Sequence, residues 1–91
     1  MKLDENEIKR RLGEIEGWSY ENNKLKKTFK FKNFYESVEF VRKIQPIADE
    51  MDHHPDLCVY YNRVVLELST HSEGGVTEKD FELAKKINKI H

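Results

Sequence analysis

The sequence predicts an α+β protein in which a four-stranded antiparallel sheet carries its helices on one face. Three observations lead to this class. Apolar residues recur at helical spacing in three segments. Four other short segments either alternate apolar with polar residues or are rich in β-branched and aromatic residues. Residues typical of tight turns separate the two members of each strand pair. Tight turns join antiparallel strands, so the expected order is α-β-β-α-β-β-α.

Length and charge limit the kinds of protein that this chain can be. The 91 residues are expected to form one domain, residues 1–91, because two domains would each be too small to bury a core. The 16 Lys and Arg residues against 17 Asp and Glu leave no net field to attract nucleic acid or an anionic membrane. A domain of this size has modest stability unless subunits associate.

The expected location is the cytoplasm. The single cysteine, Cys58, cannot form an internal disulfide, which suits a reducing compartment. No apolar run approaches the roughly 18 residues of a membrane span. The charged start of the chain, residues 1–5, lacks the apolar stretch of a signal peptide. We therefore expect neither a membrane nor nucleic acid as a direct partner.

The first helix and the first strand pair are predicted from residue 4 to residue 32. Asp4 followed by Glu7 has the form of a capping box, and Gly13 and Gly17 mark the exit of the helix. A short strand over 18–21 and a turn at 22–23 follow. From residue 25 apolar residues alternate with polar ones, which predicts a strand with one solvated face. The exception is a lysine on the apolar face, Lys27.

A helix of about 18 residues is predicted over 34–51. Asn33 followed by Glu36 has the form of a second capping box. Pro46 lies inside the helix, where it removes a backbone donor, so we expect a bend near Gln45. One apolar stripe is expected to face the core, formed by Phe34, Val38, Val41, Ile44, Ala48 and Met51.

A second hairpin and a last helix complete the predicted fold. The hairpin strands are expected at 57–61 and 64–70, with a turn at Asn62-Arg63. Thr77 with Asp80 starts the last helix, and Asp80 is interpreted as a helix-start residue rather than a catalytic one. Three sets are expected to face inward: Val64, Leu66 and Leu68 on the strand, and Phe81, Ala84 and Ile87 on the helix.

Three of the four histidines stand at predicted ends of elements. His53 and His54 precede Pro55, which biases the residue before it out of helical geometry. His71 is expected to end the last strand on its polar face. Histidine titrates near neutral pH and suits proton transfer in either direction. Two other interpretations stay open: ordinary surface histidines, and a zinc site with three histidine ligands.

Other candidate residues have structural interpretations. Trp18 and Tyr61 are expected in the core or at an interface. Cys58 lies in a predicted strand without an activating base, so we interpret it as a packing residue. His91 stands at the end of the chain and is expected to be disordered.

A set of spaced residues resembles the signature of the pterin-4a-carbinolamine dehydratases. The set consists of Asp49, three residues, His53-His54-Pro55, five residues, Tyr61, nine residues, His71, eight residues and Asp80. The resemblance extends over nearly the whole chain and includes Gly17-Trp18 and the stretch 29–34. It implies the α+β fold that the hydrophobic patterns predict.

The resemblance also implies an activity, which is loss of water from a 4a-hydroxytetrahydropterin without a metal or other cofactor. The catalytic residues would be His53, His54 and His71, with His53 and His71 as the principal acid–base pair and His54 either orienting the substrate or acting on its other face. Asp52 would orient a histidine, as carboxylates beside functional histidines commonly do. The residues expected to bind the pterin are Asp52, Pro55, Thr70, Ser72 and Glu73.

The same resemblance implies an assembly and leaves two other functions open. Members of the family form dimers and tetramers through sheet edges and long helices, so a homodimer or homotetramer is expected. Animal relatives also serve as a dimerisation partner of a transcription factor, and this chain could be such a binding protein. A protein of this fold could also act on a molybdopterin-type compound. Leu57 stands where some relatives have tryptophan, so one wall of the site is expected to be more open.

Overall fold

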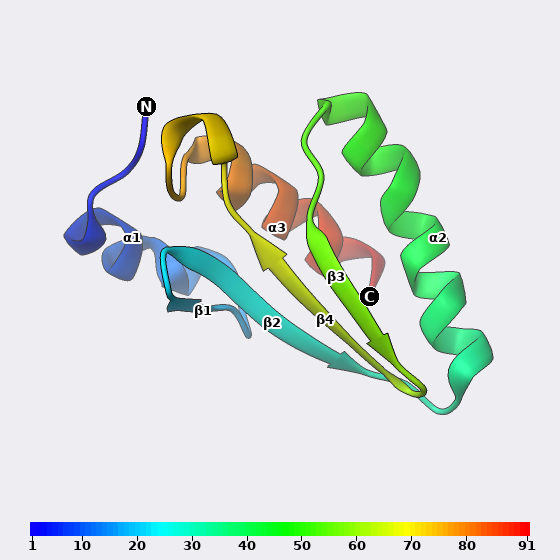
Figure 1. Ribbon diagram of the computed structural model, residues 1–91. Helices are drawn as coiled ribbons and strands as arrows, with labels where there is room; N and C mark the ends of the chain where they lie inside the picture. The colour runs from blue at the N-terminus through cyan, green and yellow to red at the C-terminus, as the bar shows by residue number, and fades with distance from the viewer.

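The computed structural model describes residues 1–91, and it confirms the predicted fold class (Figure 1). Four antiparallel strands form one sheet in the order β1-β2-β4-β3, and α2 and α3 lie on one face of it. The elements are α1 (Glu5–Arg11), η1 (Leu12–Glu14), β1 (Ser19–Glu21), β2 (Lys24–Lys30), α2 (Phe34–Met51), β3 (Asp56–Tyr60), β4 (Arg63–Leu68), η2 (His71–Glu73) and α3 (Glu78–Ile90), where η1 and η2 are short 3-10 helices.

Each of the three α-helices begins at its predicted cap. The side chains of Asp4 and Asn33 accept hydrogen bonds from backbone N–H groups three residues further on, and Thr77 caps α3. The second capping box differs from the expected one, because the Glu36 carboxylate accepts from the backbone N–H of Lys32, at 2.9 Å, instead of Asn33. The box therefore also fixes the residue that leads into α2.

Both hairpins turn in two residues. Asn22 and Asn23 have φ angles of 51° and 64°, a conformation that asparagine tolerates better than most residues. In the second hairpin Arg63 already pairs in the sheet, so the turn is Tyr61-Asn62 and the expected turn at Asn62-Arg63 is wrong by one residue. Tyr61 supplies the positive φ there, at 50°.

The core lies between the sheet and the two long helices. The alternating apolar residues of β2 and β4 point into it, as predicted, and so do the predicted residues of α3. Burying apolar surface contributes about 25 cal/mol per Å², so this layer is the main source of stability. Its members with almost no exposed surface include Leu25, Phe29, Val64, Leu66, Leu68, Phe81, Ala84 and Ile87.

Lys27 points to the core side of the sheet, as the alternation predicts, and the structure satisfies its charge there. Its Nζ donates to the carbonyl oxygen of Glu16 and to Oδ1 of Asn88, both at 2.9 Å, and lies over the ring of Phe29. Desolvation by burial lowers the pKa of the Lys27 ammonium. Asn88 Oδ1 also accepts from Nε1 of Trp18, which is buried in the core as expected.

Helix α2 has the predicted bounds, but the stripe that it buries is rotated from the predicted one. Ile44 and Ala48 are buried as expected, whereas Phe34 is 53% exposed. Ser37 and Phe40 take the central positions, because the Phe40 ring packs on the rings of β2 and the following loop. The predicted members Val38, Val41 and Met51 flank the stripe and are half-buried.

Pro46 lies within α2, and the helix continues through it to Met51. Its side chain is on the exposed side of the helix. Water can reach that side and satisfy the carbonyl group that proline leaves without a partner. The bend near Gln45 stays a prediction.

His91 is ordered against an aromatic cluster, so the expectation of a disordered end is wrong. Its ring packs edge-on to the rings of Phe29, Phe31 and Phe40, with centroid separations of 5.0, 5.4 and 5.7 Å. Edge-to-face packing of aromatic rings is favourable at such distances. The contact attaches the end of α3 to β2 and α2.

None of the helices combines the length and the apolar character that crossing a membrane requires.

Candidate active site

The predicted site residues come from segments that lie at the same end of the molecule, where α2 ends, η2 turns and α3 begins (Figure 1). Asp52 ends α2 in a left-handed conformation, with φ of 51°. The N–H groups of Asp52 and His53 bond back to the carbonyl groups of Asp49 and Ala48. Beyond this closure the chain runs without regular secondary structure to β3, and the two histidine rings contact carboxylates on different helices.

His53 forms a close pair with Asp80 of α3. The distance from His53 Nε2 to Asp80 Oδ1 is 2.6 Å. The His53 side chain is 10% exposed and that of Asp80 is fully buried. Two ionisable groups so close together and so far from water suit a function in proton transfer.

The buried carboxylate of Asp80 also holds the chain on the other side of the site. Its Oδ2 accepts from the backbone N–H of Thr77 and from the hydroxyl of Thr70, both at 2.9 Å. The hydroxyl groups of Thr70 and Thr77 are 2.7 Å apart. Thr70 immediately precedes His71, so Asp80 connects His53 to the segment that carries His71.

His71 opens η2 and is not part of β4, which ends at Leu68. The expectation that His71 ends the last strand is therefore wrong. The physical reason is a tight turn: the Thr70 carbonyl accepts N–H bonds from Glu73 and Gly74, while its N–H bonds to the carbonyl of Gly75. The turn leaves the side chains of His71 and the next two residues exposed.

His54 has a carboxylate partner of its own at the surface. Its Nε2 lies 2.8 Å from Asp49 Oδ1, and both side chains are about half exposed. This contact, with a second hydrogen bond from Gln45, lowers the pKa of Asp49 below the usual range. Asp49 is thus the residue that fixes the ring of His54.

The carboxylates that contact the histidines are therefore Asp80 and Asp49. The expectation that Asp52 orients a histidine is wrong, because its position at the end of α2 leaves both rings bonded elsewhere. The interpretation of Asp80 as a capping-box residue is confirmed. Asp80 also contacts His53, a second role that its position in the spaced signature could have indicated.

Two hollows border the site. One of about 380 Å³ is lined by Thr70, Ser72 and Glu73 together with the start of the chain and of α3. A second, of about 230 Å³, is lined by His71 and Thr70 together with the turn between β1 and β2. Three of the residues expected to bind substrate thus border a common space.

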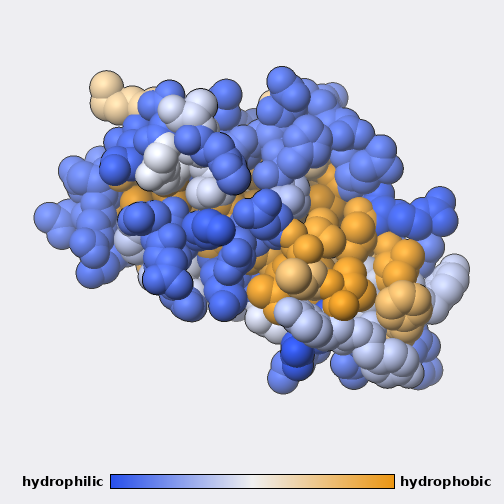
Figure 2. Space-filling view, viewed as in Figure 1, coloured by the Kyte–Doolittle hydropathy of each residue, from blue (hydrophilic) through white to orange (hydrophobic).

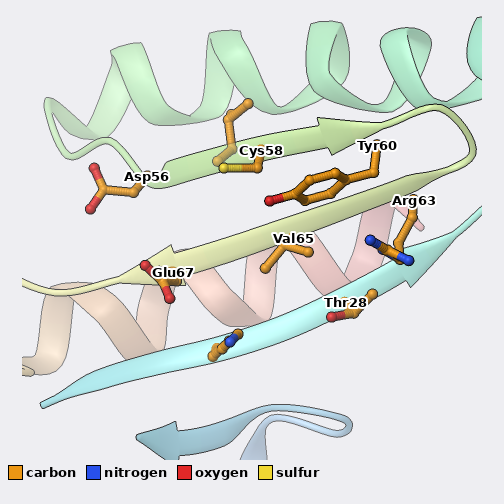
Figure 3. A pocket seen from close by; sticks show the side chains of 9 residues that line it. Thr28, Asp56, Cys58, Tyr60, Arg63, Val65 and Glu67 are labelled. Atoms are coloured by element: carbon orange, nitrogen blue, oxygen red, sulfur yellow. The ribbon is translucent and has the colours of Figure 1, made fainter. Parts of the chain in front are cut away.

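The largest hollow, about 560 Å³, lies elsewhere, on the open face of the sheet (Figure 3). Its lining includes Cys58, Tyr60, Arg63 and Val65 but none of the three site histidines. Cys58 is exposed there, so the expectation that it is a packing residue is wrong. The alternation of β3 turns it away from the helices.

No three His, Cys, Asp or Glu side chains converge as a metal ion requires. His53 and His54 bond to carboxylates on different helices. The arrangement is that of histidines oriented by carboxylates, which can give and take protons directly.

Fold and site together define a class of protein, an α+β domain with a histidine–carboxylate pair at one end of the sheet. Residues 1–90 match the family described as pterin 4 alpha carbinolamine dehydratase. The chain belongs to this family, in agreement with the spacing of its site residues.

Relatives with high identity cover nearly the whole chain. A protein of Sulfurisphaera tokodaii named "Putative pterin-4-alpha-carbinolamine dehydratase" is 53% identical over 98% of this chain and 96% of its own length. A protein of the same name from Metallosphaera sedula is 49% identical over 98% of this chain and 93% of its own length. These names support pterin-4a-carbinolamine dehydratase activity in general.

Two solved structures are similar. A transcriptional coactivator/pterin dehydratase from Brucella melitensis superposes with a TM-score of 0.94 at 38% identity, over 99% of this chain and 98% of its own. A pterin dehydratase-like protein identified as a RuBisCO assembly factor superposes with a TM-score of 0.65 at 18% identity, over 80% of this chain and 84% of its own. The second likeness shows the fold alone.

Proposed function

We propose that this protein removes water from a 4a-hydroxytetrahydropterin, such as 4a-hydroxytetrahydrobiopterin, and releases the quinonoid dihydropterin. The observation that carries the proposal is the buried pair of His53 and Asp80, joined through Thr70 to the turn with His71, in a member of this family. The reaction would support the recycling of tetrahydropterin.

The chemistry requires an acid that protonates the departing hydroxyl group on C4a and a base that takes the proton from N5. The bond between C4a and the hydroxyl oxygen breaks, and its electrons leave with the oxygen, which takes a proton and departs as water. The electrons of the N5–H bond form the new double bond between N5 and C4a, and a base takes that proton. Histidine can serve in either role near neutral pH, and such proton transfer contributes roughly 10²–10⁴-fold to a rate.

We assign the two proton transfers to His53 and His71 between them. The buried carboxylate of Asp80 bonds to His53 and also accepts from Thr70, which begins the hydrogen-bonded turn with His71. His54 lies at the surface with Asp49, which suits it to orienting the substrate. Ser72 and Glu73 border the adjoining hollow and would contact the pterin together with Asp52 and Pro55.

A direct assay tests the activity. The purified protein is supplied with enzymatically generated 4a-hydroxytetrahydropterin, and the appearance of quinonoid dihydropterin is followed against the uncatalysed rate. Acceleration proportional to protein concentration supports the proposal. A panel that includes a molybdopterin-type compound tests the substrate class, and turnover of that compound alone would overturn the assignment to 4a-hydroxytetrahydropterins.

A second candidate function is binding to a regulatory protein. It is favoured by one finding, that the Brucella melitensis protein is described as both a transcriptional coactivator and a pterin dehydratase. Recovery of a stoichiometric protein partner, together with absence of dehydratase turnover, would favour this function over catalysis. The nearly balanced charge of the chain supports a protein partner rather than DNA.

We also propose that the protein acts as a homodimer or homotetramer in the cytoplasm. Five large apolar side chains of α2, β3 and the β3–β4 turn are exposed, namely Phe34, Tyr35, Leu57, Tyr60 and Tyr61. Figure 2 shows a hydrophobic area over β3 and the neighbouring part of α2. Association would bury such surface and add the stability that a chain of this length lacks. Cys58 is exposed and forms no disulfide, which suits the cytoplasm.

A further inference from the structure

We propose that Thr77, Thr70 and Asp80 form a one-way chain of hydrogen bonds that keeps the proton of His53 on Nε2. Nδ1 is then the atom of His53 that exchanges a proton with the substrate, and Thr70 and Thr77 are positioning residues. The inference rests on the proposed function and adds to it the reacting atom and two residues that act through Asp80.

The partners of Asp80 fix the first part of the chain. Its Oδ2 receives two donors, the backbone N–H of Thr77 and the hydroxyl of Thr70. Its Oδ1 is left for His53, at 2.6 Å. An ionised carboxylate can only accept hydrogen bonds, so the short contact to His53 Nε2 places a proton on that nitrogen.

The two hydroxyl groups give the chain its direction. Thr70 has one hydroxyl proton, which it donates to Asp80, so in its contact with Thr77 it is the acceptor. Thr77 Oγ1 therefore donates to Thr70, and it accepts from the backbone N–H of Lys79 at 3.3 Å. Every donor in the chain points toward Asp80, and the three members are buried.

The second nitrogen of His53 is free to react. Nδ1 has no hydrogen-bond partner within the protein, whereas no fully buried side-chain nitrogen or oxygen lacks one. Nδ1 is therefore accessible from outside the protein even though the ring is only 10% exposed. In the neutral ring Nδ1 carries the lone pair that accepts a proton, and in the charged ring it carries the proton that can be given away.

This arrangement changes the role expected of Thr70. Its side chain is directed into the protein, with its hydroxyl committed to Asp80 and Thr77. It therefore acts on the reaction through His53 and not by side-chain contact with the pterin. The capping box of α3 needs only Thr77 and Asp80, so the Thr70 hydroxyl can be removed without removing the helix cap.

The tautomer can be measured without substrate. Protein labelled with ¹⁵N in its histidines is examined by two-dimensional NMR, which distinguishes a protonated ring nitrogen from an unprotonated one. We expect neutral His53 to carry its proton on Nε2 and none on Nδ1. A neutral His53 protonated on Nδ1 would overturn the proposal whatever the activity of the protein, so its failure is distinguishable from failure of the proposed function.

Thr70→Val tests the contribution of the hydroxyl at nearly constant shape. We expect a mixture of His53 tautomers and a fall in kcat of roughly 10–100-fold, the scale found for groups that orient metal-bound histidines. Thr70→Ser keeps the hydroxyl group and should therefore retain most of the Nε2 tautomer and most of the wild-type kcat. Thr28→Val, a matched change at an exposed position of β2, should alter neither. An unchanged tautomer and kcat in folded Thr70→Val protein would overturn the role of Thr70.

Discussion

At the scale of single residues, the two adjacent histidines have different environments. His53 is nearly buried against Asp80, whereas His54 and Asp49 are about half exposed. The main chain causes this difference, because α2 ends in a left-handed residue, Asp52, and both histidines lie beyond the helix, in the segment without regular secondary structure before β3. Their rings contact carboxylates of different helices, Asp80 of α3 and Asp49 of α2. A single pair of sequence neighbours can therefore supply both a buried proton carrier and a surface contact.

The Asp49 carboxyl gives a prediction about pH. Its folded-state pKa is lowered mainly by the hydrogen bond with His54 and secondarily by Gln45. The contribution of this contact to stability is thus present above the ordinary Asp pKa and is lost as the pH falls through the lower folded-state value. NMR titration of the carboxyl carbon should give a midpoint below that of a model Asp, and His54→Ala should raise it.

A matched change separates the two causes of that shift. Gln45→Ala removes only the second hydrogen bond, so it should raise the Asp49 midpoint less than His54→Ala does. Equal midpoints in the wild-type protein and in His54→Ala would contradict the contact between these residues. Because Asp49 is exposed to solvent, the titration is expected to be visible without unfolding of the chain.

At the scale of elements, Asn88 of α3 holds three segments together. Its Oδ1 accepts from Trp18 Nε1 and Lys27 Nζ, and its Nδ2 donates to the carbonyl of Glu16. Asn88→Ala would leave a buried indole N–H and a half-buried ammonium without this acceptor. We expect a loss of about 1–3 kcal/mol in the free energy of unfolding, measured by urea denaturation. A change within about 0.5 kcal/mol, as for ordinary surface substitutions, would contradict this role.

Pro46 gives a second prediction at this scale. Proline inside a helix costs up to about 3 kcal/mol relative to alanine, and Pro46 lies on the exposed side of α2. Pro46→Ala should therefore raise the urea midpoint and straighten the expected bend near Gln45. A matched change at another exposed helical position, Lys43→Ala, should have little effect. A lower midpoint in Pro46→Ala would show that the core depends on a bent α2.

The elements could largely be predicted from the sequence, because local chemistry determines them. The three N-caps, the Asn-Asn turn and the alternation of β2 and β4 are decided within a few residues. The buried stripe of α2 could not be placed, since it depends on the Phe40 ring meeting Phe29 and Phe31 from another element. The order of His91 has the same cause, a cluster of rings from distant parts of the chain.

For the site, the sequence indicated the segments that carry the histidines but not the carboxylates that contact them. His53, His54 and His71 were found from residue type and spacing. The contact of His53 with Asp80 could not be assigned, because an Asp in a capping box is already explained by the helix that it starts. Asp52 is nearer to the histidines in the sequence, but the end of α2 leaves them bonded to other carboxylates. Which carboxylate contacts each histidine depends on how α2 and α3 pack in the folded chain.

At the scale of the whole molecule, the exposed apolar side chains predict association. Leu57 on the edge strand β3 is 38% exposed, and a charge there would oppose burial of this edge against a second copy. We expect light scattering to give a dimer or tetramer for the wild-type protein. We expect a smaller species for Leu57→Glu, and no change for Asn6→Glu on the exposed surface of α1. A wild-type monomer at micromolar concentration would contradict the assembly.

The most direct test of the central claim is the dehydratase assay with His53→Ala and His71→Ala beside the wild-type protein. We predict that the wild-type protein forms quinonoid dihydropterin from 4a-hydroxytetrahydropterin well above the uncatalysed rate. Each variant should retain the circular-dichroism spectrum of the folded protein and lose roughly 10²–10⁴-fold in kcat, the contribution expected of a general acid or base. Folded variants that turn over as fast as the wild-type protein would contradict the assignment of the reaction to these histidines.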